Sequence, residues 1–318
     1  MRLRGVLAVA FTVALVMSAV PAEASVAIRT VVAYNPAAGE FPEGLAVDKR
    51  GNIYTSLVEP AGEIRVLRPN GAQAVIAHFP VSGFGPLGLA VDPPGNLFVA
   101  VASFDPGTEG VYRVHADGTS TRLPGTGSIL FPNGIALDKQ GTIYATDSIS
   151  GAVWRIPRGG SAAIWAQSPL LQGNGAAGLG FPLGANGIAL RHGRVIVSNT
   201  EGGSLVRIPV ERDGSAGTPA VIAQGPNLFG ADGVALSVHG NIYVAVNSQS
   251  TLLCVDPGGS ITTLATSADG LENPASPAFG TGMGERKTLF LTNFAVFAAS
   301  PNPALLAASV GEPGQPLP

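Results

Sequence analysis

The chain has 318 residues, of which 46% are hydrophobic and only 12% charged, with a formal net charge of −3. This weakly acidic balance comes without any cluster of Lys or Arg. It therefore excludes the basic surface that nucleic-acid binding requires, and we expect no nucleic-acid partner. The single cysteine, Cys254, excludes an intrachain disulfide.

The first 24 residues have the parts of a secretory signal peptide. Arg2 and Arg4 supply positive charge, residues 6–20 form an apolar run, and residues 22–24 read Ala-Glu-Ala, a typical cleavage site. The run is short for a membrane span, which needs ~20 apolar residues. We therefore expect residues 1–24 to be removed, no membrane span in the remaining chain, and a secreted or periplasmic protein.

One motif recurs along the rest of the chain. Its clearest copy, residues 41–54, starts Phe-Pro-Glu-Gly-Leu-Ala-Val-Asp and continues through a Gly-Asn turn into Ile-Tyr. The motif glycine recurs, with Ser276 in a worn sixth copy, as Gly44, Gly88, Gly134, Gly187 and Gly233. A period in the forties with short alternating strands is typical of a β-propeller. We therefore predict an all-β fold for residues 25–318, as a single domain that forms a six-bladed β-propeller with four strands per blade.

The outer strands of several blades are also visible in the sequence. Alternating runs separated by Pro/Gly/Asn turns predict paired outer strands at 63–68 and 73–79, 152–156 and 162–167, and 251–255 and 261–265. The sixth blade is one strand short, because only residues 289–293 and 304–310 follow its first strand. We expect the alternating N-terminal segment 26–34 to supply the outer strand of this last blade and to close the ring.

The residue before the motif glycine, which we call the slot, differs from blade to blade. In blade order the slots are Glu43, Leu87, Asn133, Asn186, Asp232 and Ala275. Equivalent positions of all blades surround the propeller axis, so the four oxygen donors should meet at one mouth of the channel. Carboxylate and amide oxygens suit a hard cation such as Ca²⁺, and another divalent cation is compatible. The sequence thus predicts a metal site formed by Glu43, Asn133, Asn186 and Asp232.

Further polar residues fall where the second strand of a blade returns to the same mouth. They are Asp147, Asn199 and Asn293, with Asn247 one place later. They could brace the metal ligands or line the pocket, but Asp and Asn also suit strand ends, and the sequence leaves both interpretations open. The longest connection, residues 168–185, is a candidate lid or pocket wall, or a plain surface excursion.

The motif and the order of its slots resemble the gluconolactonase/senescence-marker family of six-bladed, calcium-dependent lactonases and esterases, and more distantly paraoxonase and diisopropyl fluorophosphatase. In that group a Glu, two Asn and an Asp hold one catalytic divalent ion. The resemblance gives these places to Glu43 in Pro-Glu-Gly, Asn133 in Pro-Asn-Gly, Asn186 in Ala-Asn-Gly and Asp232 in Ala-Asp-Gly. It also implies that Asp232 is the catalytic base or nucleophile. The chain departs from the family in two ways: Asn133 precedes a Gly where many members have Asp, and no Arg matches a sugar-acid site.

The resemblance implies a secreted, Ca²⁺-dependent hydrolase of a small-molecule lactone or carboxylic ester, and we expect it to be a monomer. The alternative is a non-catalytic binding propeller, because NHL-like repeats share the motif and vary freely at the slot. A strictosidine-synthase-like or lyase-type propeller would want a Glu or His elsewhere, and the chain lacks such candidates. The ring of four oxygen donors favours the hydrolase.

Overall fold

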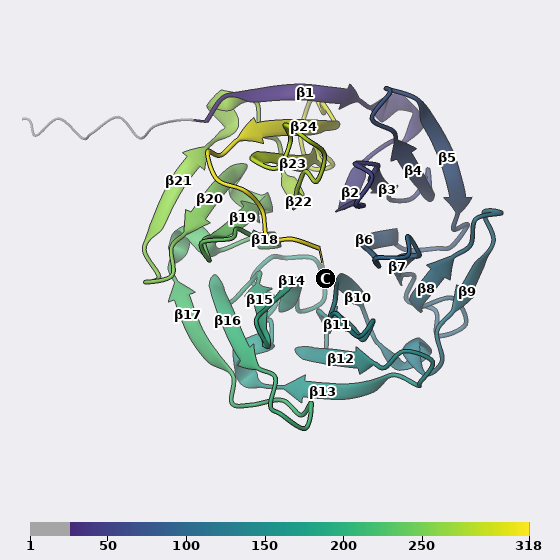
Figure 1. Ribbon diagram of the computed structural model, residues 1–318, viewed down its shortest axis with the longest axis vertical. Coiled ribbons are helices and arrows are strands. Elements are labelled where there is room, and N and C mark those ends of the chain that lie inside the picture. The colour runs from purple at the N-terminus through teal and green to yellow at the C-terminus, as the bar shows by residue number, and fades with distance from the viewer. Residues whose placement is uncertain (1–25, 318) are drawn as a thin grey trace, which may run out of the picture.

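The computed structural model describes residues 26–317, so the predicted signal peptide lies outside the described residues. Six antiparallel sheets of four strands each stand as blades around a central axis (Figure 1). This arrangement is a six-bladed β-propeller and confirms the predicted fold class. Within residues 26–317, no helix is long and apolar enough to cross a membrane.

In blades 1 to 5 the strands follow one another in chain order from the channel to the rim (Figure 1). Blades 1 to 3 consist of β2 (Pro42–Val47), β3 (Ile53–Leu57), β4 (Glu63–Leu67), β5 (Gln73–His78); β6 (Gly85–Val91), β7 (Leu97–Ala102), β8 (Gly110–Val114), β9 (Ser120–Arg122); and β10 (Pro132–Leu137), β11 (Ile143–Asp147), β12 (Ala152–Ile156), β13 (Ala163–Gln167). Blades 4 and 5 consist of β14 (Ala185–Arg191), β15 (Arg194–Asn199), β16 (Ser204–Pro209), β17 (Ala220–Gln224); and β18 (Ala231–Leu236), β19 (Ile242–Val246), β20 (Thr251–Val255), β21 (Ile261–Ala265).

Blade 6 combines the two ends of the chain. Its strands, from the channel outward, are β22 (Pro274–Phe279), β23 (Thr288–Asn293), β24 (Ala304–Ser309) and β1 (Ile28–Ala33). The antiparallel pairing of β1 with β24 confirms the predicted closure of the last blade by the N-terminal strand. Short 3-10 turns lie in the connections: η1 (Pro36–Ala38), η2 (Thr126–Ser128), η3 (Pro169–Leu171), η4 (Pro226–Leu228), η5 (Asn247–Gln249) and η6 (Ser267–Asp269).

The hydrophobic core is divided into layers between neighbouring blades. Each of six clusters draws its side chains from two adjacent blades, as Tyr144 of β11 and Val195 of β15 do between blades 3 and 4. Burying one large apolar side chain contributes about 1.5–3 kcal/mol. Because each blade packs against two neighbours, the ring must close for every layer to be covered.

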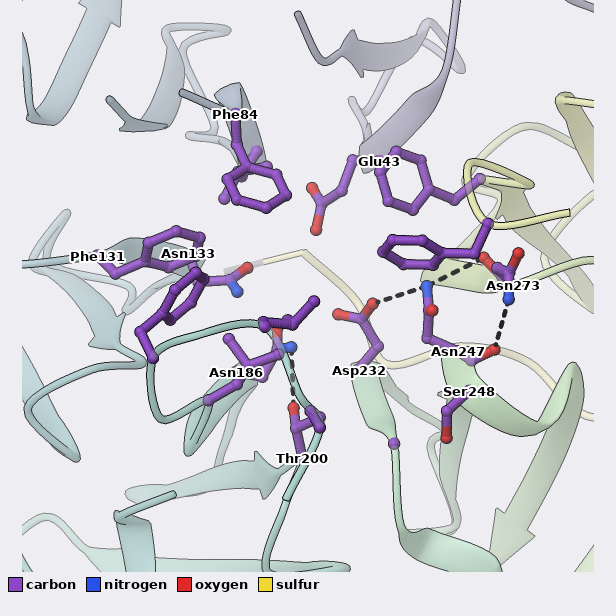
Figure 2. A pocket seen from close by; sticks show the side chains of 18 of the residues that line it. Glu43, Phe84, Phe131, Asn133, Asn186, Thr200, Asp232, Asn247, Ser248 and Asn273 are labelled. Atoms are coloured by element: carbon purple, nitrogen blue, oxygen red, sulfur yellow. Dashed lines mark hydrogen bonds between the residues drawn. The ribbon is translucent and has the colours of Figure 1, made fainter. Parts of the chain in front are cut away.

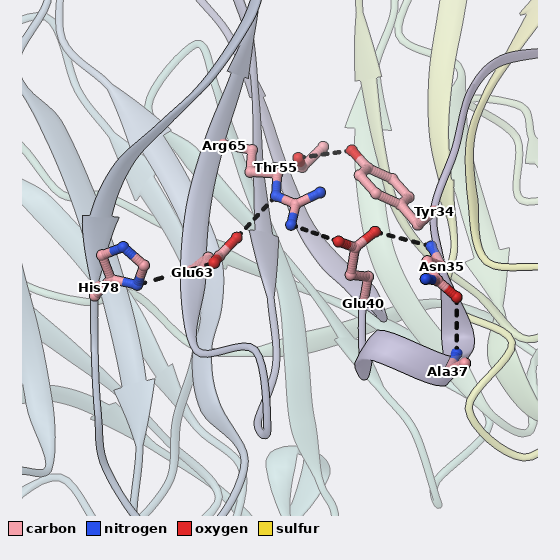
Figure 3. A network of polar contacts seen from close by, with 8 residues as sticks. All are labelled: Tyr34, Asn35, Ala37, Glu40, Thr55, Glu63, Arg65 and His78. Atoms are coloured by element: carbon pink, nitrogen blue, oxygen red, sulfur yellow. Dashed lines mark hydrogen bonds and ion pairs between the residues drawn. The ribbon is translucent and has the colours of Figure 1, made fainter.

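Polar contacts fasten the seam where the N-terminal segment enters blade 1 (Figure 3). The hydroxyl of Tyr34, just after β1, lies 2.9 Å from the hydroxyl of Thr55 in β3. Arg65 of β4 forms ion pairs with Glu40 at 2.7 Å and Glu63 at 2.8 Å. The segment between β1 and β2 is therefore tied to blade 1 while β1 itself belongs to blade 6, so one stretch of chain joins the two blades.

The motif glycines stand where the inner strands of neighbouring blades crowd together. A Cβ on Gly44 would lie 2.1 Å from the carbonyl oxygen of Leu87, and one on Gly187 would lie 2.3 Å from that of Asp232. Each slot and its glycine also form an irregularity in the strand pairing, as between Pro132 and Ile135 in blade 3. A bulge of this kind re-aims a side chain, and here it directs the slots into the channel.

The C-terminal segment, residues 311–317, runs from blade 6 toward the propeller axis (Figure 1). Gln315 donates from its backbone N–H to the carbonyl of Leu236 and from its side-chain amide to the carbonyl of Leu190, both at 2.8 Å. Both acceptors lie near the far ends of inner strands, away from the slots. We call this end of the channel the tail mouth and the end with the slots the slot mouth.

Candidate functional site

The four polar slot side chains surround one space at the slot mouth (Figure 2). Glu43, Asn133, Asn186 and Asp232 each stand second in the inner strand of a different blade: β2, β10, β14 and β18. Their exposed fractions are only 4–8%, and all four line one cavity of about 400 Å³. The structure therefore brings together the four residues that the sequence selected.

The two asparagines are oriented by hydroxyl groups on the neighbouring strand ends. Asn133 Nδ2 donates to Ser148 Oγ at 3.3 Å, and Asn186 Nδ2 donates to Thr200 Oγ1 at 3.0 Å. Each hydroxyl in turn donates to a backbone carbonyl of the next blade, at 2.6 and 2.8 Å. Because the hydroxyls hold the amide nitrogens, both amide oxygens are left free to face the cavity.

Together, the carboxylates of Glu43 and Asp232 form fewer hydrogen bonds with the protein than the two asparagine amides do. Within residues 26–317, no group forms a hydrogen bond with the buried Oε2 atom of Glu43. The matching position that holds a hydroxyl in blades 3 and 4 is Val58 in blade 1. Asp232 Oδ2 accepts one long hydrogen bond, 3.4 Å, from Asn247 Nδ2. The Glu43 and Asp232 carboxylates thus lack the hydrogen-bond or ionic partners that a buried charge normally has.

Burial shapes the electrostatics of this pair. Desolvation and the nearby Asp232 carboxylate raise the pKa of Glu43 well above its usual range. Desolvation also raises the pKa of Asp232, against the lowering effect of the nearby Asn247 and Asn186 amides. Among the described residues that line the cavity there is no Lys, Arg or His. Two facing carboxylates in such surroundings are stabilised by a proton or a cation between them.

The donor set fits a hard divalent cation. Two carboxylates and two amide oxygens offer four of the six to eight oxygen ligands that Ca²⁺ takes. Across residues 26–317, no three His, Cys, Asp or Glu side chains come together as a metal-binding group, so a cation site here depends on the asparagine oxygens. The partnerless oxygen of Glu43 is the atom that such an ion would satisfy.

Three of the predicted supporting residues have other partners. Asp147 accepts backbone N–H groups, and Asn199 and Asn293 both donate to backbone carbonyls and accept backbone N–H groups. All of these partners lie in the connections just before or just after the inner strands of the same blade. These three residues therefore have the structural role that Asp and Asn commonly have at strand ends. Of the four predicted supporting residues, only Asn247 contacts a slot side chain. The reason is that side chains alternate along a strand, so the next residue, such as Ser148, faces the channel.

The supporting hydroxyls Ser148 and Thr200 were missed in the sequence. A signal exists, because one place at the end of the second strand, or directly after it, is equivalent in all six blades. Reading that place in blade order gives Val58, Ala102, Ser148, Thr200, Asn247 and Phe294. Polar side chains occur there only in blades 3 to 5, the blades whose slots are Asn, Asn and Asp.

Above the slots the cavity wall is largely aromatic (Figure 2). Six phenylalanines from several blades line it: Phe84, Phe131, Phe181, Phe229, Phe294 and Phe297. The rings of Phe84, Phe131 and Phe181 lie 5.4–6.5 Å apart, within the range of favourable aromatic contacts. The cavity thus combines a polar floor with an apolar wall, as small-molecule sites commonly do.

Part of the long connection 168–185 forms one side of this wall. Residues 176, 177, 179, 181 and 183 line the cavity. The carboxylate of Glu201 accepts backbone N–H groups from Asn174 at 2.5 Å, Gly175 at 2.6 Å and Ala177 at 3.0 Å. The structure therefore supports the interpretation as a pocket wall, and a buried acid fastens it to blade 4.

Comparison with known protein families agrees with the motifs. The model of a family described as SMP-30/Gluconolactonase/LRE-like region matches residues 182–295. The matched stretch contains Asn186, Asp232 and Asn247. It confirms, over this part of the chain, the resemblance that the motifs indicated. No curated protein sequence matches the chain.

Solved structures with the same fold include enzymes and a calcium-binding protein. A gluconolactonase from Xanthomonas campestris is 17% identical, with a TM-score of 0.63 over 94% of this chain and 99% of its own. Regucalcin from Agrobacterium tumefaciens, a calcium-binding protein, is 18% identical, with a TM-score of 0.67 over 92% and 95%. A catalytically inactive His-to-Ala variant of virginiamycin B lyase from Staphylococcus aureus is 14% identical, with a TM-score of 0.59 over 89% and 99%. At these identities the likeness establishes the fold.

Proposed function

We propose that this protein is a secreted or periplasmic hydrolase that cleaves a lactone or a carboxylic ester and depends on a divalent cation, Ca²⁺ in the first place. One observation carries the proposal: Glu43 and Asp232 are buried around one space, and Glu43 keeps an oxygen without a protein partner. The match to the gluconolactonase-like family over residues 182–295 supports it.

The proposed ligands are the side-chain oxygens of Glu43, Asn133, Asn186 and Asp232. When bound, a divalent cation at this place supplies charge that polarises the substrate carbonyl and stabilises the negative oxygen of the transition state. The asparagine oxygens are suited to this role because their amide nitrogens are already occupied by hydroxyl groups. The apolar wall excludes water around the bound substrate, which strengthens these interactions.

Asp232 has the catalytic role in this proposal. Its carboxylate accepts a proton from a water molecule as the water oxygen adds to the substrate carbonyl carbon. The bond between that carbon and the ester oxygen then breaks, and the departing oxygen takes up the proton. The products are an acid and an alcohol, joined in one molecule when the substrate is a lactone. Asn247 orients the Asp232 carboxylate through its amide.

A lyase that depends on histidine is not favoured. The Staphylococcus aureus lyase with this fold is described as catalytically inactive when a His is replaced by Ala. None of the described residues that line the cavity here is a histidine. The polar floor instead consists of carboxylates, amides and hydroxyl groups.

The experiment is to replace Asp232 by Asn and to measure turnover of a panel of lactones and aryl esters with Ca²⁺ present. Asp232→Asn keeps an oxygen in the ring but removes the base, so kcat should fall by at least ~10²-fold. Lys139→Ala, in the β10–β11 hairpin at the tail-mouth side, is the control and should leave kcat unchanged.

Two outcomes would contradict the proposal. Full activity of Asp232→Asn would exclude its catalytic role even if Ca²⁺ binds. A wild-type protein that hydrolyses nothing in the panel, and whose melting temperature is the same in excess chelator and in excess Ca²⁺, would be the non-catalytic binding propeller. A bound ion raises stability by about 2.7 kcal/mol at a hundredfold excess over its Kd, so the melting comparison is decisive for the cation.

A further inference from the structure

The side chains of the cavity wall indicate which chemical class of substrate fits the slot mouth. Apart from the four slot donors, the polar side chains that line it are Thr200, Asn247, Ser248 and Asn273. Each of these already forms a hydrogen bond within the protein. A ligand with many hydroxyl groups would therefore bury several of them without free partners, and each such group is costly.

The opposite side of the cavity offers a continuous aromatic surface. Phe84, Phe131 and Phe181 pack against one another, and Phe104 extends the group toward solvent with ring centroids 5.4–6.2 Å from the other three. Phe104 is 49% exposed, so the core does not require its ring. Phe297, which packs on Phe294 and lines the same cavity, is 61% exposed.

The backbone at Phe104 is unfavourable for a bulky residue. Its φ is +58°, in the left-handed region where glycine is the usual choice. The carboxylate of Glu109 holds this turn by accepting the backbone N–H groups of Ser103 at 2.9 Å and Phe104 at 2.6 Å. A strained, half-exposed aromatic residue at the edge of a cavity is a feature of functional sites.

From these three observations we infer that the substrate carries an apolar acyl, alkyl or aryl group that packs against the Phe84–Phe104–Phe131–Phe181 surface, with its lactone or ester carbonyl at the slot floor. This inference rests on the proposed hydrolase and narrows its substrate class. Polyhydroxylated sugar lactones fit the cavity poorly because its wall is largely apolar, and anionic substrates fit it poorly because its free polar groups are acceptors and carboxylates.

The test uses three lactones with the same six-membered ring: δ-valerolactone, δ-decalactone, which adds a pentyl chain, and glucono-δ-lactone. Each methylene that becomes buried contributes about fourfold, so burial of the whole pentyl chain should make kcat/KM about 10³-fold higher for δ-decalactone than for δ-valerolactone. Glucono-δ-lactone should be the poorest of the three. A preference for glucono-δ-lactone, or no effect of the pentyl chain, would overturn the inference while leaving the hydrolase intact.

A binding measurement separates the wall from the chemistry. The lactam analogue of δ-decalactone cannot be readily hydrolysed, and calorimetry should show that it binds with a negative heat-capacity change, as burial of apolar surface requires. Phe181→Ala and Phe104→Gly should each weaken this binding about tenfold, whereas Ile164→Ala, at an equally exposed residue of β13, should not.

Phe104→Gly also tests the alternative of a purely structural ring, because glycine adopts the left-handed backbone without strain. We expect this variant to keep the wild-type melting temperature while it loses affinity for the lactam. If the lactam binds as predicted but no lactone or ester is hydrolysed, the apolar site stands and the hydrolase fails. If the lactam does not bind to the wild type, or binds to both Phe variants with wild-type affinity, the inference fails.

Discussion

The slot mouth and the tail mouth are built from opposite ends of the same inner strands. At the slot mouth the strands begin with Glu43, Asn133, Asn186 and Asp232 in a small cavity of about 400 Å³ with an aromatic wall. At the tail mouth the last residues of the strands are mostly apolar, and they line a larger hollow of about 690 Å³ that also takes in the C-terminal segment. The slot mouth brings together oxygen acceptors that lack donors, whereas the tail mouth is covered by the C-terminal segment, which is hydrogen-bonded to the inner strands.

The difference shows that some positions of the repeated motif stabilise the fold while another position is free to form a functional site. Leu45, Leu89 and Ile135, each directly after the motif glycine, keep the same aliphatic chemistry in successive blades, because each packs into a layer between blades. The slot lies on a bulge outside that packing, so its side chain varies at little cost to the ring. We therefore expect changes at the slot mouth to affect activity and changes at the tail mouth to affect stability.

The largest effect should come from Gly187→Ala. The new Cβ would lie 2.3 Å from the carbonyl oxygen of Asp232 and 2.7 Å from the Cα of Gly233, so backbone must move. This shifts two slot donors at once, and we expect kcat/KM to fall by at least ~10²-fold and unfolding to be easier by about 2–3 kcal/mol. Gly258→Ala is the matched control, because it lies in an exposed hairpin where the new Cβ would meet only the Asp256 side chain, 3.2 Å from its Oδ1. It should change kcat/KM by no more than twofold and the free energy of unfolding by no more than ~0.5 kcal/mol. Wild-type activity in Gly187→Ala would mean that the slot geometry is not critical.

Deletion of residues 311–318 at the tail mouth should lower stability and leave activity nearly unchanged. The deletion removes the backbone bonds of Gln315 and Pro313 and the contacts of Glu312 with Tyr243 and Asn241. At about 1 kcal/mol per net hydrogen bond, we expect a loss of about 2–4 kcal/mol in the free energy of unfolding, measured with denaturant. Below the unfolding transition kcat/KM should remain within twofold of the wild type. A tenfold loss of activity in the folded variant would show that the two mouths are coupled.

The smallest effects concern pH, and they have opposite signs at the two mouths. At the slot mouth, burial raises the pKa of Glu109 to about 7 despite hydrogen bonds from Ser103 and Phe104. Its stabilising contribution is therefore complete below the unfolded pKa of about 4.3 and is lost as pH rises through 7. Glu109→Gln should remove this loss, so that the free energy of unfolding falls less between pH 4 and pH 9 than it does in the wild type.

At the tail mouth the corresponding carboxyl is Glu312. Burial disfavours its charged form, but hydrogen bonds from Tyr243 and Asn241 outweigh burial and lower its pKa. Its contribution is therefore present above the unfolded pKa and is lost as pH falls through the folded value. Denaturant titrations across pH should show that Glu312→Gln flattens the acid side of the stability profile and Glu109→Gln the neutral to alkaline side. Identical profiles for both variants would contradict the assignment.

The sequence by itself determined the blades, the closure and the identity of the slot donors. The motif glycines recur at a fixed period, and equivalent residues of a propeller must surround one axis, so Glu43, Asn133, Asn186 and Asp232 could be grouped without coordinates. The N-terminal segment could be placed because blade 6 lacked a strand and residues 26–34 alternate. In each case the repetition of a local pattern was sufficient to place the residues relative to the propeller axis.

Only the tertiary structure decided what surrounds those donors. Phe84 and Phe181 come from the connections that enter blades 2 and 4, whereas Phe104 comes from the β7–β8 connection within blade 2, so the three do not occupy equivalent places in the repeat. The tail crosses the channel through single hydrogen bonds to strands far away in sequence, such as that from Gln315 to Leu190. Even Asp147 and Ser148, adjacent in the chain, face different surroundings, because side chains alternate along a strand. Contacts between non-repeated segments leave no periodic pattern in the sequence, so they can be identified only in the folded structure.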